Sequence, residues 1–188
     1  MKTKLFLSVF ILCITYASAF ALVAANLYGG YTVGGKYEDY DVKYKDKFRY
    51  GGSVHFNKSF LMFFQLGLGG YYQMSSVAYG NSWRNTFTVD KTDIGIDGYA
   101  ALDIPLVPLS PYVRGGSATW NKIEYSGVSK TGNFDKHHVG GGLLITVLPI
   151  PALLKLQLFA EYIYAFGKEG GEKNTEHQVN LGIRGDFL

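Results

Sequence analysis

Apolar and polar residues alternate along most of this chain, most clearly between Leu154 and Gly167. The even positions there carry apolar or aromatic side chains, whereas the odd positions include Lys155, Gln157 and Glu161. Successive side chains of a strand point to opposite faces, so the pattern predicts a strand with one apolar and one polar face. The same period predicts eight strands in all, near residues 27–33, 48–56, 62–68, 94–104, 112–120, 139–147, 154–167 and 179–187.

The connections between these strands alternate in length. Short connections are predicted at 57–59, 105–111 and 149–151, and the last two contain proline, which cannot donate to a strand ladder. Long polar connections are predicted at 37–46, 74–92, 122–136 and 168–175. An up-and-down meander with all long loops at one end and both termini at the other produces this order.

Two arrangements of such a meander are open: a membrane barrel with its apolar face outward, and a secreted soluble barrel or sandwich with that face inward. The apolar face is rich in Tyr, Phe and Leu, and the polar face carries few charges. Strands of roughly ten to thirteen residues are long enough to cross a bilayer at a tilt. An even number of strands also closes without an unpaired edge in hydrocarbon. We therefore expect an all-β fold, an eight-stranded antiparallel up-and-down transmembrane β-barrel.

Composition narrows the class further. The 188 residues allow one domain, and 47% hydrophobic with 16% aromatic residues argue against disorder. The single cysteine, Cys13, excludes a disulfide framework. The formal net charge of +3 gives no electrostatic footprint for a nucleic-acid partner.

The first 21 residues match a secretory signal peptide. Lys2 and Lys4 precede an apolar run over 5–16, which is followed by small residues over 17–21. We expect cleavage after Ala19 or Ala21, which leaves residues 22–188 as a single barrel domain. A membrane-anchoring helix is the alternative, but the apolar run is shorter than the roughly 20 residues that a spanning helix needs.

With its signal peptide, eight amphipathic strands and alternating loop lengths, the chain resembles the small bacterial outer-membrane barrels of the OmpA, OmpX and OmpW type. In that group the last strand carries an assembly signal of a glycine, an apolar residue and a terminal aromatic, and Gly182 and Phe187 match its first and last members. Gly185 stands where an apolar residue is usual, and Leu188 follows the aromatic. The resemblance implies outer-membrane lipid and the assembly machinery as partners.

Charged residues in the polar phase of the strands are predicted to face the lumen. Eight strands leave an interior just wide enough for side chains to fill, and charges buried there must be paired. Hairpin register suggests pairs between Lys155 and Asp186 and between Arg114 and Asp103. An ion or proton path is the alternative to a structural network. The predicted lumen charges are Arg49, Asp93, Asp97, Asp103, Arg114, Lys155, Glu161, Arg184 and Asp186.

Aromatic and charged residues in the first two long connections are candidates for surface contact. Tyr, Trp and Arg are enriched at interaction hot spots, and loops on a rigid scaffold often carry function. The alternative is that these aromatics lie at the outer membrane interface. The candidates are Tyr40, Tyr44, Tyr79, Trp83 and Arg84.

Three functions are compatible with this pattern. The first is a non-enzymatic barrel that stabilises the envelope and contacts a host or envelope ligand through its long loops. The second is a narrow channel for small or hydrophobic molecules, and the third is a surface enzyme acting on lipid. The sequence has no G-x-S-x-G elbow and no metal-ligand spacing, so we expect neither catalysis nor a cofactor.

Overall fold

The computed structural model describes residues 22–37, 40–43, 48–60, 63–80, 86–103, 107–125, 127–132, 135–150, 154–169 and 172–187. These form ten strands: β1 (Leu22–Tyr37), β2 (Tyr40–Lys43), β3 (Phe48–Phe60), β4 (Phe64–Gly80), β5 (Thr86–Leu102), β6 (Leu109–Tyr125), β7 (Val128–Gly132), β8 (Lys136–Ile150), β9 (Leu154–Glu169) and β10 (Glu172–Phe187). Within these ranges no helix is long and apolar enough to cross a membrane. The predicted signal peptide, residues 1–21, lies outside them and stays a prediction.

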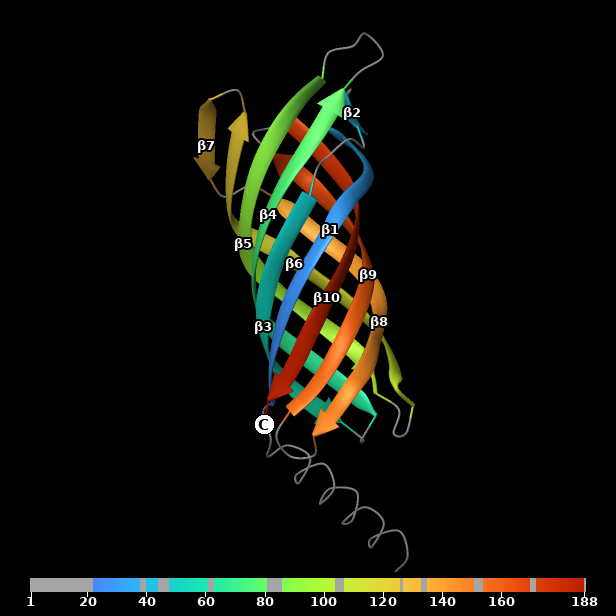
Figure 1. Cartoon of the computed structure of the whole chain (residues 1–188). Helices are drawn as coiled ribbons and strands as arrows, with labels where there is room; N and C mark the ends of the chain where they lie inside the picture. The colour runs from blue at the N-terminus through green and yellow to red at the C-terminus, as the bar shows by residue number, and fades with distance from the viewer. Residues whose placement is uncertain are drawn as a thin grey trace, which may run out of the picture.

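Eight long strands, all except β2 and β7, close into an antiparallel barrel (Figure 1). Each long strand pairs with the next one along the chain, and β10 pairs with β1 from Val23↔Phe187 to Tyr37↔Asn174. Closure leaves no long strand with a free edge, which is the condition for a sheet in hydrocarbon. The predicted eight-stranded up-and-down barrel is confirmed.

The two ends of the barrel differ. The C-terminus and the β3–β4, β5–β6 and β8–β9 connections lie at the lower end, and the short strands β2 and β7 lie at the upper end (Figure 1). Strand β2 pairs with β1 and β4, whereas β7 pairs with the end of β6. We call the upper end the outer end, in line with the predicted membrane barrel, in which longer loops lie on the outer side and short turns on the periplasmic side.

Several strands are longer than the sequence predicts. Strand β4 runs to Gly80 and β5 begins at Thr86, inside the predicted 74–92 loop, and β9 and β10 extend to within two residues of each other inside the predicted 168–175 loop. The predicted turn at 57–59 is also wrong, because β3 continues to Phe60. In these segments the two faces of the strand no longer contrast in polarity, so the alternation that identifies a strand disappears.

Side-chain exposure along the strands confirms the predicted orientation. Leu27, Leu68 and Leu181 are 63–68% exposed on the outer surface. Polar and charged side chains such as Gln157 and Asp97 are 1–2% exposed and face the lumen. This is the reverse of a soluble protein and fits a barrel surrounded by acyl chains.

Candidate functional site

The centre of the lumen holds an ion-pair cluster built from four strands. Arg114 on β6 donates from Nη1 to both carboxylate oxygens of Glu161 on β9, at 3.1 Å each, and from Nη2 to Asp97 on β5. The hydroxyl of Tyr112 and the amide of Asn180 on β10 each donate to Glu161 at 2.8 Å. Both carboxylates are fully buried, so Arg114 compensates two charges that would otherwise be costly in this interior.

The predicted Arg114–Asp103 pair is wrong. The ladder sets Arg114 opposite Tyr99 and two residues from Asp97, while Asp103 at the end of β5 accepts from Ser110 at 3.0 Å. The guanidinium therefore reaches up the barrel, toward Asp97, and not toward the lower rim. The sequence predicts the inward direction of Arg114 but not which of several inward acids it meets.

Two histidines, His55 and His138, belong to the same cluster, although neither is among the predicted lumen charges. His55 Nε2 lies 2.8 Å from Asp97 Oδ1, and its Nδ1 lies 3.1 Å from the Asn26 amide nitrogen. The His138 Nε2 atom lies 3.8 Å from Asp97 Oδ2. His55 lies at an odd position of β3, like Arg49 and Ser53, and the sequence alternation could therefore have predicted that its side chain faces the lumen.

The lower end of the lumen contains two further ion pairs. Arg184 donates from Nε to Asp186 at 2.6 Å and from Nη2 to Gln65 at 3.2 Å, and its guanidinium stacks 4.4 Å from the centroid of the Tyr99 ring. Lys155 donates to Asp103 at 2.6 Å.

The predicted Lys155–Asp186 register is present, since the two residues are ladder partners. The predicted ion pair between them is wrong. Asp186 is instead bonded by Arg184 of its own strand, so the Lys155 ammonium crosses the lumen to Asp103.

Near the outer end, two buried lysines hold acids on distant strands. Lys136 donates to Asp93 at 2.7 Å, and Lys91 donates to Glu176 at 2.5 Å. Lys91, Lys136 and Glu176 were not among the predicted lumen charges, because all three fall within or beside segments predicted as loops. The inward phase of Asp93 and Asp97 continues to Lys91, so extending that parity would have found it.

Arg49, by contrast, forms no ion pair within 4 Å among the described residues. Its side chain is 1% exposed, and its Nε and Nη1 atoms make no hydrogen bond. The site is polar, and an ordered water is the usual partner for such a buried group.

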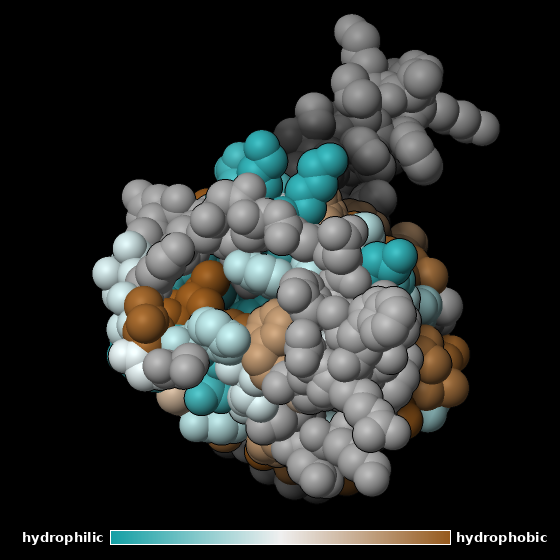
Figure 2. All heavy atoms as spheres, turned by 90° about the horizontal axis from the view of Figure 1, so that it is seen from above, coloured by the Kyte–Doolittle hydropathy of each residue, from teal (hydrophilic) through white to brown (hydrophobic). Residues whose placement is uncertain are grey.

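An apolar cluster fills the lumen above these charges. Val77, Tyr79, Val89 and Ile123 are buried together, with Tyr37 and Phe87 packed against them. Seen from above, apolar side chains lie inside the rim of this end (Figure 2). The cluster places apolar side chains in the lumen at this end, mainly from β4, β5 and β6.

The prediction that Tyr79 is a surface contact is wrong. It lies on β4, is 0% exposed, and its hydroxyl accepts from Lys91 at 2.8 Å and donates to Glu176 at 3.0 Å. The strand continues past the predicted loop boundary, and its parity turns the ring inward. Tyr40 lies on β2, while Tyr44, Trp83 and Arg84 lie outside the described residues.

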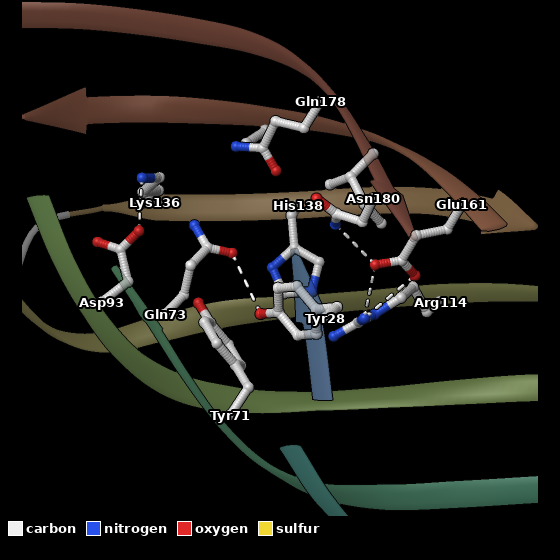
Figure 3. Close-up of a pocket in the computed structure, with 12 residues that line it drawn as sticks. Tyr28, Tyr71, Gln73, Asp93, Arg114, Lys136, His138, Glu161, Gln178 and Asn180 are labelled. Carbon is white, nitrogen blue, oxygen red and sulfur yellow. Dashed lines mark hydrogen bonds and ion pairs between the residues drawn. The ribbon is translucent and has the colours of Figure 1, made fainter. Parts of the chain in front are cut away.

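Between the charged clusters the lumen contains small polar cavities. One lies between the Arg114 cluster and the Lys136–Asp93 pair, with Tyr28, Tyr71 and Gln73 on its wall (Figure 3). A second lies lower down, beside Asn26 and Arg184. Each has a volume of about 20 Å³, which suits one water molecule.

The two residues of the expected assembly signal lie on β10. A Cβ at Gly182 would contact the Leu27 carbonyl oxygen and the Phe159 ring, so glycine gives the Phe159 side chain its space. Phe187 is 46% exposed on the outer surface at the lower end. Their role in assembly stays a prediction.

Both ring nitrogens of His55 lie within hydrogen-bond distance of Asp97 or Asn26, whereas the buried His138 Nε2 atom makes no hydrogen bond to the described residues. Ser53 accepts from the Asn26 amide at 2.9 Å, and that same amide contacts His55. Across the described strands, no serine hydroxyl bonds to a histidine. In the same residues no group of three or more His, Cys, Asp or Glu side chains is arranged to hold a metal ion.

The chain matches the family model described as outer membrane protein beta-barrel domain over residues 6–187. It belongs to this family, whose name indicates the bacterial outer membrane as the location. No curated protein matches the chain.

Among solved structures, Neisserial surface protein A is similar with a TM-score of 0.56 and 17% identity, covering 87% of this chain and 94% of that chain. Ail of Yersinia pestis, solved with the heparin analogue sucrose octasulfate, gives a TM-score of 0.48 and 17% identity over 87% of this chain and 98% of that chain. OprG of Pseudomonas aeruginosa gives a TM-score of 0.45 and 8% identity over 91% of this chain and 98% of that chain. The family match, together with the fold shared with Neisserial surface protein A, confirms the resemblance to the small outer-membrane barrels.

Proposed function

We propose that this protein is a rigid outer-membrane scaffold whose outer end contacts a host or envelope surface ligand. The filled lumen is the observation that carries this proposal. Ion pairs cross the interior at several levels, and the apolar cluster lies above them. Such an interior stabilises the barrel wall, which leaves the outer segments to carry specificity.

The β6–β7 hairpin supports a contact role. It leans away from the barrel at the upper end (Figure 1), and β7 pairs only with β6 among the described strands. Tyr125, the last residue of β6, and Val128, the first residue of β7, are ladder partners there and are 47% and 59% exposed. An open strand edge with exposed apolar side chains is a typical docking element for another chain.

The connections that carry Tyr40, Tyr44, Trp83 and Arg84 belong to the same proposal. Strands β2 and β4, which contain or adjoin these residues in the sequence, end at the same upper end as the hairpin (Figure 1), and Tyr, Trp and Arg are enriched at interaction hot spots. Gly182 and Phe187 are proposed as the signal by which the assembly machinery recognises β10.

The test is surface display in a laboratory Gram-negative strain, with adherence to host cells or matrix as the readout. Tyr125→Ser with Val128→Ser is expected to reduce adherence, whereas Phe63→Ser at the lower end is the matched control. Comparable surface amounts are checked by heat-dependent gel mobility. Equal adherence of both variants and the unmodified protein would contradict the contact role of this hairpin.

A narrow channel is the second candidate, and the polar cavities along the lumen are the observation that favours it. Planar-bilayer recording separates the two. A scaffold produces no reproducible single-channel steps, whereas steps that change when Ile123 is replaced by Ala would establish conduction through the lumen.

A further inference from the structure

A groove lies on the lipid-facing surface of the lower half of the barrel, across β3 to β6. Its volume is about 570 Å³, within the range of about 300–1,000 Å³ typical of small-molecule sites. Gly98 and Gly115 form its floor, and they are direct ladder partners on β5 and β6. Because neither has a side chain, the neighbouring side chains stand above them as walls. The walls include Phe56, Phe60, Leu66, Leu68 and Val113.

A single cation marks the lower end of this groove. Lys58 is exposed between Phe56 and Phe60, with its ammonium 5.5 Å from the centroid of the Phe60 ring. Within the described residues it forms no ion pair. The other described outward-facing residues of the lower half are uncharged, so Lys58 concentrates positive charge at one point of the lipid boundary.

We propose that the groove binds one phospholipid from the periplasmic leaflet, with an acyl chain over Gly98 and Gly115 and its phosphate on the Lys58 ammonium. The lower end of the barrel is the periplasmic one, so Lys58 lies at the level where that leaflet has its headgroups. The uncharged groove extends from there toward the bilayer centre. The order of charge and apolar surface therefore matches that of a phospholipid.

Two interactions distinguish this lipid from its neighbours. Burial of apolar surface does not favour the bound lipid over its neighbours, because lipid tails surround the whole barrel. A chain lying in the groove makes dispersion contacts on three sides, where a flat wall provides one. The phosphate adds attraction to a cation in the interfacial region.

A second copy of the barrel is the competing occupant, because small residues also let two surfaces approach closely. A symmetric dimer through this face brings two Lys58 ammonium groups to one interface, where the described residues supply no acid. Charge complementarity therefore favours the lipid.

The experiment uses native mass spectrometry of the barrel, extracted in mild detergent and titrated with phosphatidylglycerol. Gly115→Leu fills the floor of the groove, and a Cβ there would lie at an ordinary 3.4 Å from the His138 carbonyl oxygen. Gly70→Leu is the matched control, since Gly70 also faces lipid, has its nearest atom at 3.5 Å and does not line the groove. Lys58→Gln removes the charge, and Lys173→Gln on β10 is its control.

We expect the unmodified barrel to retain one lipid in a saturable manner. Gly115→Leu should weaken retention roughly tenfold, the loss expected when about ten carbon–carbon contacts disappear. Lys58→Gln should weaken it about fivefold, the usual contribution of one interfacial cation. Both controls should bind as the unmodified barrel does.

Retention that is equal in all five proteins, or that never saturates, would show ordinary boundary lipid and overturn the proposal. A dimer mass that is lost in Gly115→Leu, without a lipid adduct, would assign the groove to a second copy and also overturn it. Lys58→Gln keeps the test decisive if Gly115→Leu does not fold.

Discussion

In the lower and middle parts of the barrel the lumen is charged and the outer surface is apolar, whereas at the upper ends of β4, β5 and β6 this polarity is reversed. Arg114, Asp97 and Glu161 lie in the middle of the lumen, behind an exterior that includes Ile96 at 58% exposure. At the upper ends of β4, β5 and β6, Val77, Val89 and Ile123 face the lumen, and the exterior carries Asp90 and the Lys122–Glu124 pair. Neighbouring stretches of the same strands thus distribute polar and apolar side chains in opposite ways.

The surroundings of the barrel wall, acyl chains or water, explain this difference in side-chain polarity. Where acyl chains surround the barrel, apolar side chains face outward at no cost and the polar ones must be paired in the lumen. Where water surrounds it, the wall can bury apolar side chains as a soluble β-barrel does. The Lys91–Glu176 pair and the Tyr79 hydroxyl lie at the junction between the two regions.

Removing the central cation is expected to have the largest effect. Arg114→Ala leaves Asp97 and Glu161 buried without their partner, which should lower the free energy of unfolding by about 3–5 kcal/mol. Lys122→Ala breaks the half-exposed Lys122–Glu124 pair at the outer end and should cost less than about 1 kcal/mol. Urea unfolding in lipid vesicles, followed by tryptophan fluorescence, measures both. Equal losses would mean that the central pairs are solvated and that the contrast between the regions is false.

An isoleucine pair tests the apolar side of the comparison. Ile123→Ala opens a cavity inside the outer cluster and should cost about 2–4 kcal/mol. Ile96→Ala faces acyl chains, which fill the vacated space, so its cost should stay below about 1 kcal/mol. The same unfolding assay applies, and a larger loss for Ile96→Ala would contradict a packed core at the outer end.

The junction should show the smallest effect. Tyr79→Phe removes one hydrogen bond to Lys91 and one to Glu176 but leaves their ion pair and the ring packing in place. We expect a loss of about 1–2 kcal/mol in unfolding free energy. Tyr50→Phe is the control, because the Tyr50 hydroxyl bonds only to the sulfur of Met74 at the lipid-facing surface. If Tyr79→Phe costs as little as Tyr50→Phe, the hydroxyl does not contribute to stabilising this junction.

The alternation of residues such as Lys155, Gln157 and Glu161 with their apolar neighbours was sufficient to predict the strands, the inverted orientation and the closed barrel. The same reasoning failed for Tyr79, because at the upper end of β4 the inward phase changes from polar to apolar. A strand that changes its polar face partway loses its period, so the sequence alone suggests a loop there.

Sequence by itself therefore determined which residues face inward wherever the alternation persists, because side-chain direction in a strand depends only on parity. Tertiary structure alone decided which inward charges meet. Arg114 pairs with Asp97 and Glu161, and Lys155 with Asp103, because closing and tilting the barrel bring strands distant in the chain to the same level. The height of each side chain along the barrel axis depends on the register of all eight strands together, and a local sequence pattern does not encode that register.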